Sequence, residues 1–563
     1  MGTTLPATMR NSNQLSILGN AQASKVRKHR EGSIMFDILI QNARVIDGTG
    51  SPWYRADVGV IGDTIARIGD LSERNGHLVI DANDKVLCPG FIEIHGHSDR
   101  TLLINPLAES SIHLGVTTET IGNCGMSIAP LTSLNQEQQE HSFQRIDPGF
   151  KVEWQSTSEL FDVYRSTSCS VNIVPFVGHN TIRTACMGFQ MTPARGEVLE
   201  AMKGLLRETM EAGAHGMSTG LEYPPGSAAP TEEIIELVKI VSEYEGIYPT
   251  HIRNRDVNYL KAIDEAIEIA RKTNVPTEIA HNVAKIGADE DVMVRVFEKI
   301  EQARAQGLDI TFDVGPYLGG QTTPTASLPP WAFEGGVEQV LKRLSDPETR
   351  RKIKEWEHPI WLIIKFGMWD KVQLATSEAN PELIGKTFEE IAQLRGVEPY
   401  DVLLDLLLEE GEGMFDLFWE GEIYLPEDRD RAIAHPLSMI CCDGRALAPY
   451  GPLKKLAYHH VYTWIPYLFR YIVKERGLLT LEEAVKKVTS MSAQRLGLLD
   501  RGIVRPGMKA DLVIFDPNTV RERATLTSPH LYPEGFEWTI VNGNVTLRNG
   551  EHTGSKAGRL LTR

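Results

Sequence analysis

The chain has 563 residues, of which 42% are hydrophobic, and its formal net charge is −17. This length and apolar content allow a large buried core, in one large α/β domain with attachments or in two to three domains. The acidic balance argues against nucleic acid and anionic membranes as partners, because proteins that bind phosphate-rich surfaces carry clustered basic residues. No apolar segment approaches the roughly 20 residues that cross a bilayer. The six cysteines are scattered through the chain, which fits a reducing compartment, and we expect a cytoplasmic protein.

The two ends of the chain have β-rich patterns. Residues 1–35 contain Ser, Asn and Gln, end in a basic run, and are predicted to form a flexible tail. Residues 36–90 alternate apolar and polar side chains between Asp-Gly and Gly-Asp turn signals, which is typical of β-strands. The same pattern returns at 500–555. Because each piece is too short to close a sheet alone, we expect both to combine in one β-sandwich domain.

The central residues 91–499 alternate helical and strand patterns. Within 196–317 an amphipathic helix, a stop and a short strand follow one another four times. This α/β repeat predicts a parallel sheet, and its length favours a TIM (β/α)8 barrel over an open sheet. Residues from about 319 to 436 break the rhythm and predict an insertion that forms a lid over the barrel mouth. Near the end of the barrel, Thr480 and Glu483 have the spacing of a capping box at a helix start.

Polar residues lie where several predicted barrel strands end, which is where the active site of such a barrel is found. A lone histidine at a strand end usually has a structural role, but imidazole, thiolate and carboxylate groups gathered at one place are ligands for borderline metals such as zinc. The shared position therefore predicts a metal site. The candidate ligands are His95, His97, Cys124, His251, His281 and Asp443.

Seven motifs resemble one branch of a known superfamily. In chain order they are PGFIEIHGHSD, GVTTETIGNCGMSIAPL, VGHNTIR, GMSTGLEYPPG, YPTHIRNRD, IAHN and MICCDG. They resemble the N-acyl-D-amino-acid deacylase (D-aminoacylase) branch of the amidohydrolase superfamily, and the resemblance runs from about residue 36 to about 550. It implies a distorted TIM barrel with a composite β-sandwich and an inserted segment.

The resemblance also implies roles for the candidate ligands. Cys124, His251 and His281 would hold a tightly bound zinc ion. A second, weaker metal position would be formed by His95, His97 and Asp443. Zinc would polarise a carbonyl group and activate water, while Asp443 would accept a proton and return it to the leaving nitrogen. The implied reaction is hydrolysis of an N-acyl-D-amino acid, a small-molecule substrate, to a carboxylate and an amine.

The substrate-binding residues depart from the pattern of the branch. A lysine commonly stands two residues after the histidine that His281 matches, but here that residue is Val283 and the nearest lysine is Lys285. The arginine that binds the substrate carboxylate is replaced at the matching count by Lys454, which has no bidentate fork. Lys454 is nevertheless the candidate cation there.

Four further assignments concern other polar residues outside the six candidate ligands. Tyr317 matches a tyrosine of the branch that reaches the substrate, and Arg253 is a candidate for substrate binding. Alternatively, Arg253 and Asp256 form an ion pair that orients His251, or they belong to a solvated loop. His459 and His460 stand in an aromatic run and are read as part of a lid or a helix start rather than as ligands. His179 and His215 are predicted to have structural hydrogen-bonding roles.

Two other readings stay open. The same chemistry could act on a cyclic amide, an ester or lactone, or an activated C–C bond without a carboxylate, which the missing arginine favours. A non-catalytic scaffold is the third reading, although such relatives lose metal ligands and this chain has a suitable residue at every matched position. The sequence is compatible with a monomer or a homo-oligomer.

Overall fold

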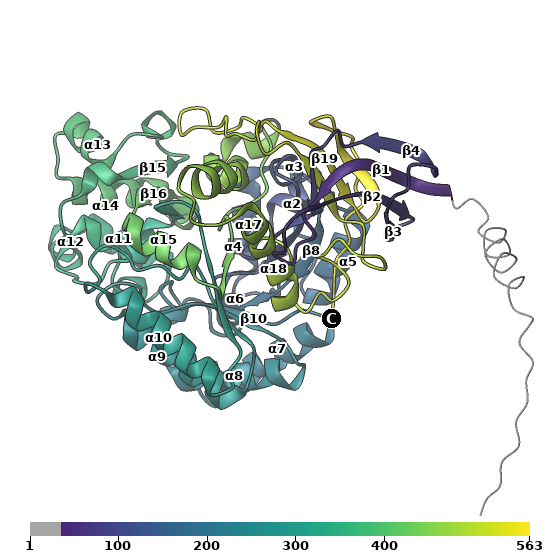
Figure 1. The fold of residues 1–563 in the computed structure, drawn as a ribbon. Coiled ribbons are helices and arrows are strands. Elements are labelled where there is room, and N and C mark those ends of the chain that lie inside the picture. The colour runs from purple at the N-terminus through teal and green to yellow at the C-terminus, as the bar shows by residue number, and fades with distance from the viewer. Residues whose placement is uncertain (1–34) are drawn as a thin grey trace, which may run out of the picture.

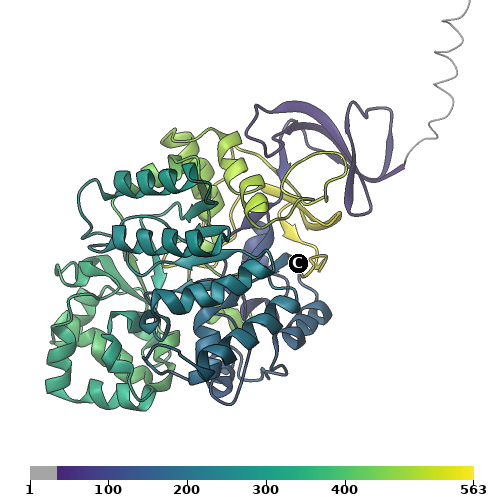
Figure 2. The same cartoon turned by 90° about the horizontal axis from the view of Figure 1, so that it is seen from below.

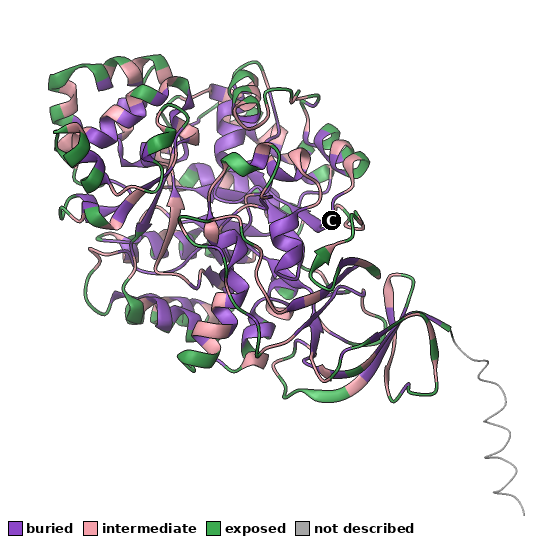
Figure 3. Ribbon diagram, turned by 90° about the horizontal axis from the view of Figure 1, so that it is seen from above, coloured by how far each residue is buried: buried purple, intermediate pink, exposed green. Residues whose placement is uncertain are grey.

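The computed structural model describes residues 35–563, so the predicted tail lies outside the described residues except for Met35. A central barrel is flanked by a sheet-rich unit on one side and by the insertion on the other (Figures 1 and 2). Buried residues are concentrated in the centre of the molecule, and exposed residues lie mostly along its outer helices and loops (Figure 3). No helix among residues 35–563 has the length and apolar character needed to cross a bilayer.

The barrel is built from short parallel strands whose residues are almost all buried, as expected for a sheet covered on both faces. One sheet has the order β17-β13-β12-β11-β10-β9, and a second has the order β6-β7-β8. Their strands are β6 Phe91–Glu93, β7 Val116–Ile121, β8 Asn172–Pro175, β9 Val177–Gly178, β10 Met217–Gly220, β11 Tyr248–His251, β12 Thr277–Ile279, β13 Ile310–Val314 and β17 Ser438–Ile440.

The two sheets form the distorted barrel that the sequence predicts. Only Phe176 separates β8 from β9, so these strands occupy one barrel position. On the other side, a single parallel bridge between Gly96 and Gly444 links the segments that follow β6 and β17. The ring of ladders is therefore incomplete there, and this gap lies beside the predicted metal ligands.

Helices on the outside connect the strands, and their apolar faces cover the barrel. The four predicted helix–strand units are present as α7–β10, α8–β11, α9–β12 and α10–β13. Thr480 caps a later helix, because its hydroxyl accepts the Glu483 N–H and the Glu483 carboxylate accepts the Thr480 N–H. The main helices are α3 Glu109–His113, α4 Gln136–Ile146, α5 Thr157–Thr167, α6 His179–Met187, α7 Glu197–Glu211, α8 Thr231–Glu243, α9 Tyr259–Thr273, α10 Val292–Ala305, α15 Pro426–Ala434, α17 Leu481–Lys487 and α18 Ser490–Arg495.

Strands from both chain ends combine in one nine-stranded sheet, as expected from their patterns. The two parts meet where β18 pairs antiparallel with β5. A separate apolar core fills this unit and includes Ile40, Val60, Leu87, Leu512 and Ile540. The strands are β1 Met35–Val45, β2 Tyr54–Ile61, β3 Thr64–Gly69, β4 Asn75–Asp81, β5 Val86–Pro89, β18 Leu512–Phe515, β19 Phe536–Val541, β20 Asn544–Arg548 and β21 Glu551–His552.

The insertion between β13 and β17 has its own sheet and its own core. Its antiparallel sheet has the order β14-β16-β15, and the Trp361 ring stacks on Trp419 at 4.7 Å within the core. Helix α15, although inside the predicted range 319–436, contacts β13, β17 and α10 of the barrel. The elements are β14 Gly319–Thr322, α11 Val337–Ser345, α12 Pro347–Lys354, β15 Val372–Thr376, α13 Phe388–Arg395, α14 Pro399–Glu410 and β16 Phe418–Glu422.

A buried charge cluster joins α6 to α8. The Glu233 carboxylate accepts a hydrogen bond from Arg183 at 2.5 Å and lies 3.1 Å from His179 Nε2. Burial alone would raise the pKa of Glu233, but the hydrogen bond and charge of His179 and the charge of Arg183 lower it to about 2. His179 therefore has the structural role predicted for it.

Glu233→Gln is expected to lower the free energy of unfolding by about 3–5 kcal/mol near neutral pH, because Arg183 would stay buried without its carboxylate. Because the folded pKa of Glu233 lies below its ordinary value of 4.5, this stabilisation is complete above that pH and is lost as the pH falls through about 2. Urea unfolding of both proteins across this range measures the difference. A difference that stays constant down to pH 2 would contradict the assignment, and the surface variant Glu236→Gln should cost at most about 1 kcal/mol.

Candidate metal centre

The six predicted ligands lie together at the C-terminal ends of five barrel strands. Because the strands are parallel, these ends meet at one edge of the barrel. The residues are His95 and His97 after β6, Cys124 after β7, His251 at the end of β11, His281 after β12 and Asp443 after β17.

The Cys124 thiol is the centre of the cluster. Its Sγ lies 3.1 Å from His95 Nε2, 3.6 Å from His251 Nδ1 and 3.7 Å from His281 Nε2. All four residues are buried. Three imidazoles therefore surround one sulfur atom in a place that bulk water does not reach.

Asp443 and His97 form the more open side of the cluster. Asp443 Oδ1 lies 3.1 Å from His97 Nε2 and 3.7 Å from His95 Nε2. The side chains of His97 and Asp443 are 21% and 32% exposed, whereas that of His95 is 2% exposed. A substrate would therefore approach from the side of Asp443.

The backbone at three of these residues has an unusual conformation. Cys124, His281 and Asp443 have φ angles of 50°, 36° and 57°, a left-handed region that residues other than glycine rarely adopt. Such strain is concentrated at functional sites, where the surrounding structure holds it in place. The three side chains are thus held in position at a cost in local backbone energy.

Glycines next to Cys124 allow the close packing that holds its loop. A Cβ atom at Gly122, whose φ is +77°, would lie 2.1 Å from the Phe176 carbonyl oxygen. A Cβ atom at Gly220, in the motif GLEYPPG, would lie 2.0 Å from the Cys124 carbonyl oxygen. The motifs GNCG and GLEYPPG therefore require these glycines, because a neighbouring backbone carbonyl oxygen lies too close to leave room for a side chain.

The protonation states of Cys124 and His281 suit metal binding, whereas His95 would have to release a proton to the arriving metal. Burial alone would lower the pKa of His95, but the negative charges of Cys124 and Asp313 hold it well above its usual range. Burial alone would raise the pKa of the Cys124 thiol, but the charge of His95 and hydrogen bonds from His251 and His95 hold it well below its usual range. Burial and the positive charge of Arg255 hold the pKa of His281 well below its usual range. Thiolates and neutral imidazoles are the forms that bind metals.

The donor atoms are close enough to share ions. Those of His95, Cys124 and His281 lie within 4.8 Å of one another, as do those of His95, His97 and Asp443. Thiolate, imidazole and carboxylate donors fit a borderline ion such as zinc, with bonds of about 2.0–2.3 Å. The geometry groups His95 with both sets, and the division of ligands between a tight and a weak position stays a prediction.

A buried ion pair holds His251 on the side of the ring that faces away from Cys124. His251 Nε2 lies 2.6 Å from Glu222 Oε2, and Lys285 Nζ donates to both Glu222 oxygens at 2.7 and 2.6 Å. Burial alone would raise the pKa of Glu222, but the Lys285 charge and the His251 hydrogen bond lower it to about 2. The carboxylate therefore leaves His251 Nδ1 free to face the Cys124 sulfur.

Glu222→Gln is expected to weaken metal binding by about 10–100-fold, because the partner that orients a metal-binding histidine is lost. Titration with a chelating competitor measures the affinity. Glu265→Gln is the matched control, since Glu265 pairs with Arg253 and not with a member of the cluster. Equal affinity in all three proteins would contradict the role of Glu222.

Asp313, at the end of β13, is a second supporting carboxylate. Its Oδ2 lies 3.1 Å from His95 Nδ1, and its Oδ1 accepts the His281 N–H at 2.7 Å. Neither Asp313 nor Glu222 was predicted from the sequence. Both could have been found by the rule used for the ligands, because Asp313 is the last residue but one of β13, in TFDVGPY, and Glu222 follows β10 by two residues, in GLEYPPG.

The three predicted substrate-binding residues have different surroundings. Tyr317 stacks on His460 at 3.6 Å and its hydroxyl lies 2.5 Å from Thr463 Oγ1. It lines a cavity of about 700 Å³. Lys454 is exposed in the short helix Pro452–Lys455.

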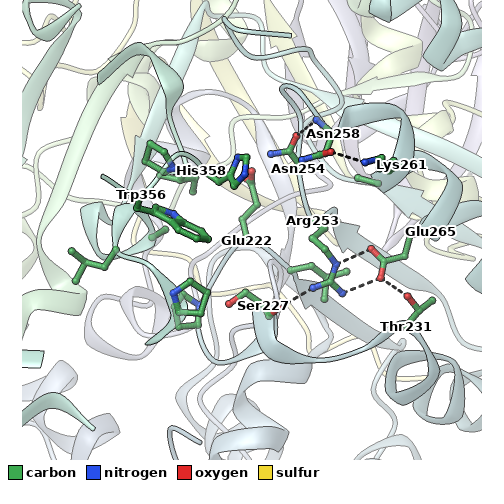
Figure 4. Close-up of a pocket in the computed structure, with 18 residues that line it drawn as sticks. Glu222, Ser227, Thr231, Arg253, Asn254, Asn258, Lys261, Glu265, Trp356 and His358 are labelled. Atoms are coloured by element: carbon green, nitrogen blue, oxygen red, sulfur yellow. Dashed lines mark hydrogen bonds and ion pairs between the residues drawn. The ribbon is translucent and has the colours of Figure 1, made fainter. Parts of the chain in front are cut away.

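Arg253 faces a different cavity from the one that Tyr317 lines. Its guanidinium donates to Glu265 at 3.0 and 2.9 Å and to the carbonyl oxygen of Ser227 at 3.0 Å (Figure 4). It also donates to the carbonyl oxygen of Ala229 at 2.9 Å. These bonds occupy most of its donors, so neither a bond to His251 nor a free fork for a substrate is present. The cavity beside it, of about 550 Å³, lies between the barrel and insertion residues such as Trp356.

Comparisons with known proteins agree with this geometry. The sequence matches the model of the amidohydrolase family over residues 78–547. A D-aminoacylase of Alcaligenes xylosoxydans xylosoxydans is 33% identical over 94% of this chain and 98% of that protein. The likeness in sequence thus extends through the barrel, the insertion and the composite sheet.

Solved structures show the same likeness in three dimensions. The crystal structure of a D-aminoacylase has a TM-score of 0.78 at 32% identity, covering 94% of this chain and all of that one. N-acyl-D-glutamate deacylase from Bordetella bronchiseptica, solved with zinc and a phosphonate mimic of the tetrahedral intermediate, has a TM-score of 0.79 at 27% identity with the same coverage. The predicted fold and resemblance are confirmed.

Proposed function

The chain belongs to the amidohydrolase family, and we propose that it hydrolyses the amide bond of an N-acyl-D-amino acid or a related N-acyl compound with zinc as cofactor. The observation that carries this proposal is the buried Cys124 thiol among three imidazoles, with the Asp443 carboxylate beside them. The names of its relatives agree, since they include a D-aminoacylase and an N-acyl-D-glutamate deacylase.

Zinc held by the Cys124 cluster would polarise the scissile carbonyl and activate water when bound. Asp443 supplies the proton transfer. Burial alone would raise its pKa, but the charge of His95 and the hydrogen bond and charge of His97 lower it to about 2, so the carboxylate is ionised at neutral pH. It can accept a proton from water and deliver it to the leaving nitrogen.

Arg445 is our proposed contact for the substrate carboxylate. It follows Asp443 by two positions, and its guanidinium lies 4.4 Å from the centre of the Phe418 ring of β16. Among residues 35–563 no carboxylate is ion-paired with it. Burial and the charge of Arg100 lower its pKa, which means that a buried anion there would be bound favourably. The exposed Lys454 is less suited, because a solvated ammonium group binds a carboxylate weakly.

Arg445→Met is expected to raise KM for an N-acyl-D-amino acid by about 10–100-fold, because a hydrogen bond to a charged group contributes about 1.5–3 kcal/mol. Activity on the matching neutral amide should change little. Steady-state kinetics on both substrates measure the two effects. Lys454→Met is the matched control, and a larger effect there than at Arg445 would return the role to Lys454.

The proposal is tested by a hydrolysis screen of the zinc-loaded protein on N-acetyl-D-amino acids, N-acetyl-L-amino acids, neutral and cyclic amides, esters and lactones. Cleavage of the D-compounds is the expected result. Activity on neutral or cyclic amides alone would favour the reading without a substrate carboxylate. A protein that binds zinc but hydrolyses none of these compounds would favour a scaffold.

The state of the cysteines supports a proposal for the cellular location of the enzyme. All six cysteines are free thiols, and five of them are buried. Reduced thiols fit a cytoplasmic location, where disulfides are rare. We propose that the enzyme acts there on a small-molecule substrate.

A further inference from the structure

A second cluster of metal-binding side chains lies outside the barrel centre. Glu420 belongs to β16 of the insertion, whereas His459 and His460 begin the 3-10 helix His459–Tyr462 that follows β17. The sequence predicted a lid or a helix start at these two histidines and no ligand role, and it did not predict the approach of Glu420. Glu420 Oε1 lies 3.8 Å from His459 Nδ1 and 4.0 Å from His460 Nε2.

These separations suit one ion. Zinc bonds to imidazole nitrogen and carboxylate oxygen measure about 2.0–2.2 Å, so two ligands of a tetrahedral zinc lie about 3.4 Å apart. Both distances from Glu420 exceed this separation by less than about 1 Å. All three donor atoms lie within 4.8 Å of one another, so a small movement of the side chains would complete the site.

Neighbouring groups hold two of the three side chains in a ligand-ready orientation. Gln321 Nε2 donates to Glu420 Oε2 at 3.2 Å, which leaves Oε1 directed at the histidines. The Tyr458 hydroxyl lies 3.0 Å from His460 Nδ1. When Nδ1 carries the proton and donates it, the His460 Nε2 lone pair faces Glu420. Metal-binding histidines are typically held by such a partner on the other ring nitrogen.

The third side chain lacks a partner. His459 Nδ1 is buried and finds no hydrogen-bond partner among the described residues. Burial lowers the pKa of His459 to about 4 and raises the pKa of Glu420 to about 7. A buried polar atom without a partner costs free energy, and a cation between Nδ1 and Glu420 Oε1 would remove that cost.

A cavity of about 700 Å³ gives access to the cluster. Glu420, His459 and His460 line it together with Tyr317 and Thr463. None of the six ligands of the barrel centre is among the described residues that line this cavity. The cluster can therefore exchange ions with solvent without passing through the barrel centre.

We propose that Glu420, His459 and His460 form a second divalent-cation site that binds zinc and ties the insertion to the segment after β17. The site lies beside Tyr317, which stacks on His460 and is predicted to contact the substrate, but the site does not depend on the proposed function. Because zinc would bind this site in the folded chain and not in the unfolded chain, it would also stabilise the contact between the insertion and the segment after β17.

The zinc content of the full-length protein tests the proposal. Protein freed of metal with a chelator is equilibrated with zinc, separated from free ions and analysed by mass spectrometry. Glu420→Gln and His459→Gln are each expected to contain one zinc per chain fewer than the unchanged protein. Glu422→Gln, on the same strand and largely exposed, should contain as much zinc as the unchanged protein. Equal zinc in all four proteins would overturn the proposal.

Two further measurements separate this site from the barrel centre. In a Cys124→Ala background, Glu420→Gln should still remove one zinc per chain, whatever the catalytic activity of the protein. The second measurement uses crystals of the unchanged protein grown with zinc, so its result does not depend on whether a variant folds. Anomalous diffraction at the zinc edge should show a peak between Glu420 and the two histidines, and density for the barrel zinc without this peak would contradict the site.

Discussion

Asp443→Asn is expected to lower kcat on an N-acyl-D-amino acid by about 10²–10⁴-fold. The variant should keep most of its zinc, with a loss of less than one ion per chain. A positioned general acid or base contributes about that factor, and the Cys124 thiol with its three imidazoles is left in place. Steady-state kinetics and metal analysis on the same sample measure both quantities. The amide side chain keeps the shape of Asp443 but cannot accept the proton.

Asp162→Asn serves as the control, because Asp162 is a mostly exposed residue of α5 that pairs with Arg165. Its kinetics should equal those of the unchanged protein. If Asp443→Asn kept full activity, the proton would be transferred by another group. If it lost all zinc and all activity together, Asp443 would be a required ligand rather than the base.

Cys124→Ala is expected to have the second large effect, loss of the tightly bound zinc together with activity. The fall in kcat/KM should exceed the roughly 100-fold that loss of a supporting partner causes, because the atom at the centre of the cluster is removed. Zinc affinity by chelator competition and kinetics at saturating zinc measure the two losses.

The matched control is Cys186→Ala, since Cys186 is a partly buried thiol of α6 whose pKa is raised to about 11 by burial. It should bind zinc and turn over substrate normally. Activity of Cys124→Ala restored fully by excess zinc would mean that histidines and Asp443 alone hold the catalytic ion.

The sequence was sufficient to predict where the candidate ligands would meet. His251 and His281 each end a helix–strand unit, and parallel strands bring such ends to one edge. The capping box at Thr480 was also readable, because its two hydrogen bonds are local and depend on a three-residue spacing. Features set by local periodicity or by strand direction were therefore predictable from the chain itself.

Contacts between distant segments could not be predicted in this way. Lys285 was noted only as a lysine two positions away from the expected one, yet in the fold it pairs with Glu222 and so supports His251. Likewise Glu420 reaches His459 only because the insertion folds back on the segment after β17. Such pairings depend on packing across the chain, which no spacing within a motif encodes.

The protein loaded with one equivalent of zinc offers the most direct test of the central claim, that a thiolate-containing metal centre carries the activity. X-ray absorption at the zinc edge should then show a sulfur neighbour at about 2.3 Å together with nitrogen or oxygen neighbours at about 2.0–2.2 Å. The sulfur signal should disappear in Cys124→Ala. A catalytically active sample with only nitrogen and oxygen around its zinc would contradict the account.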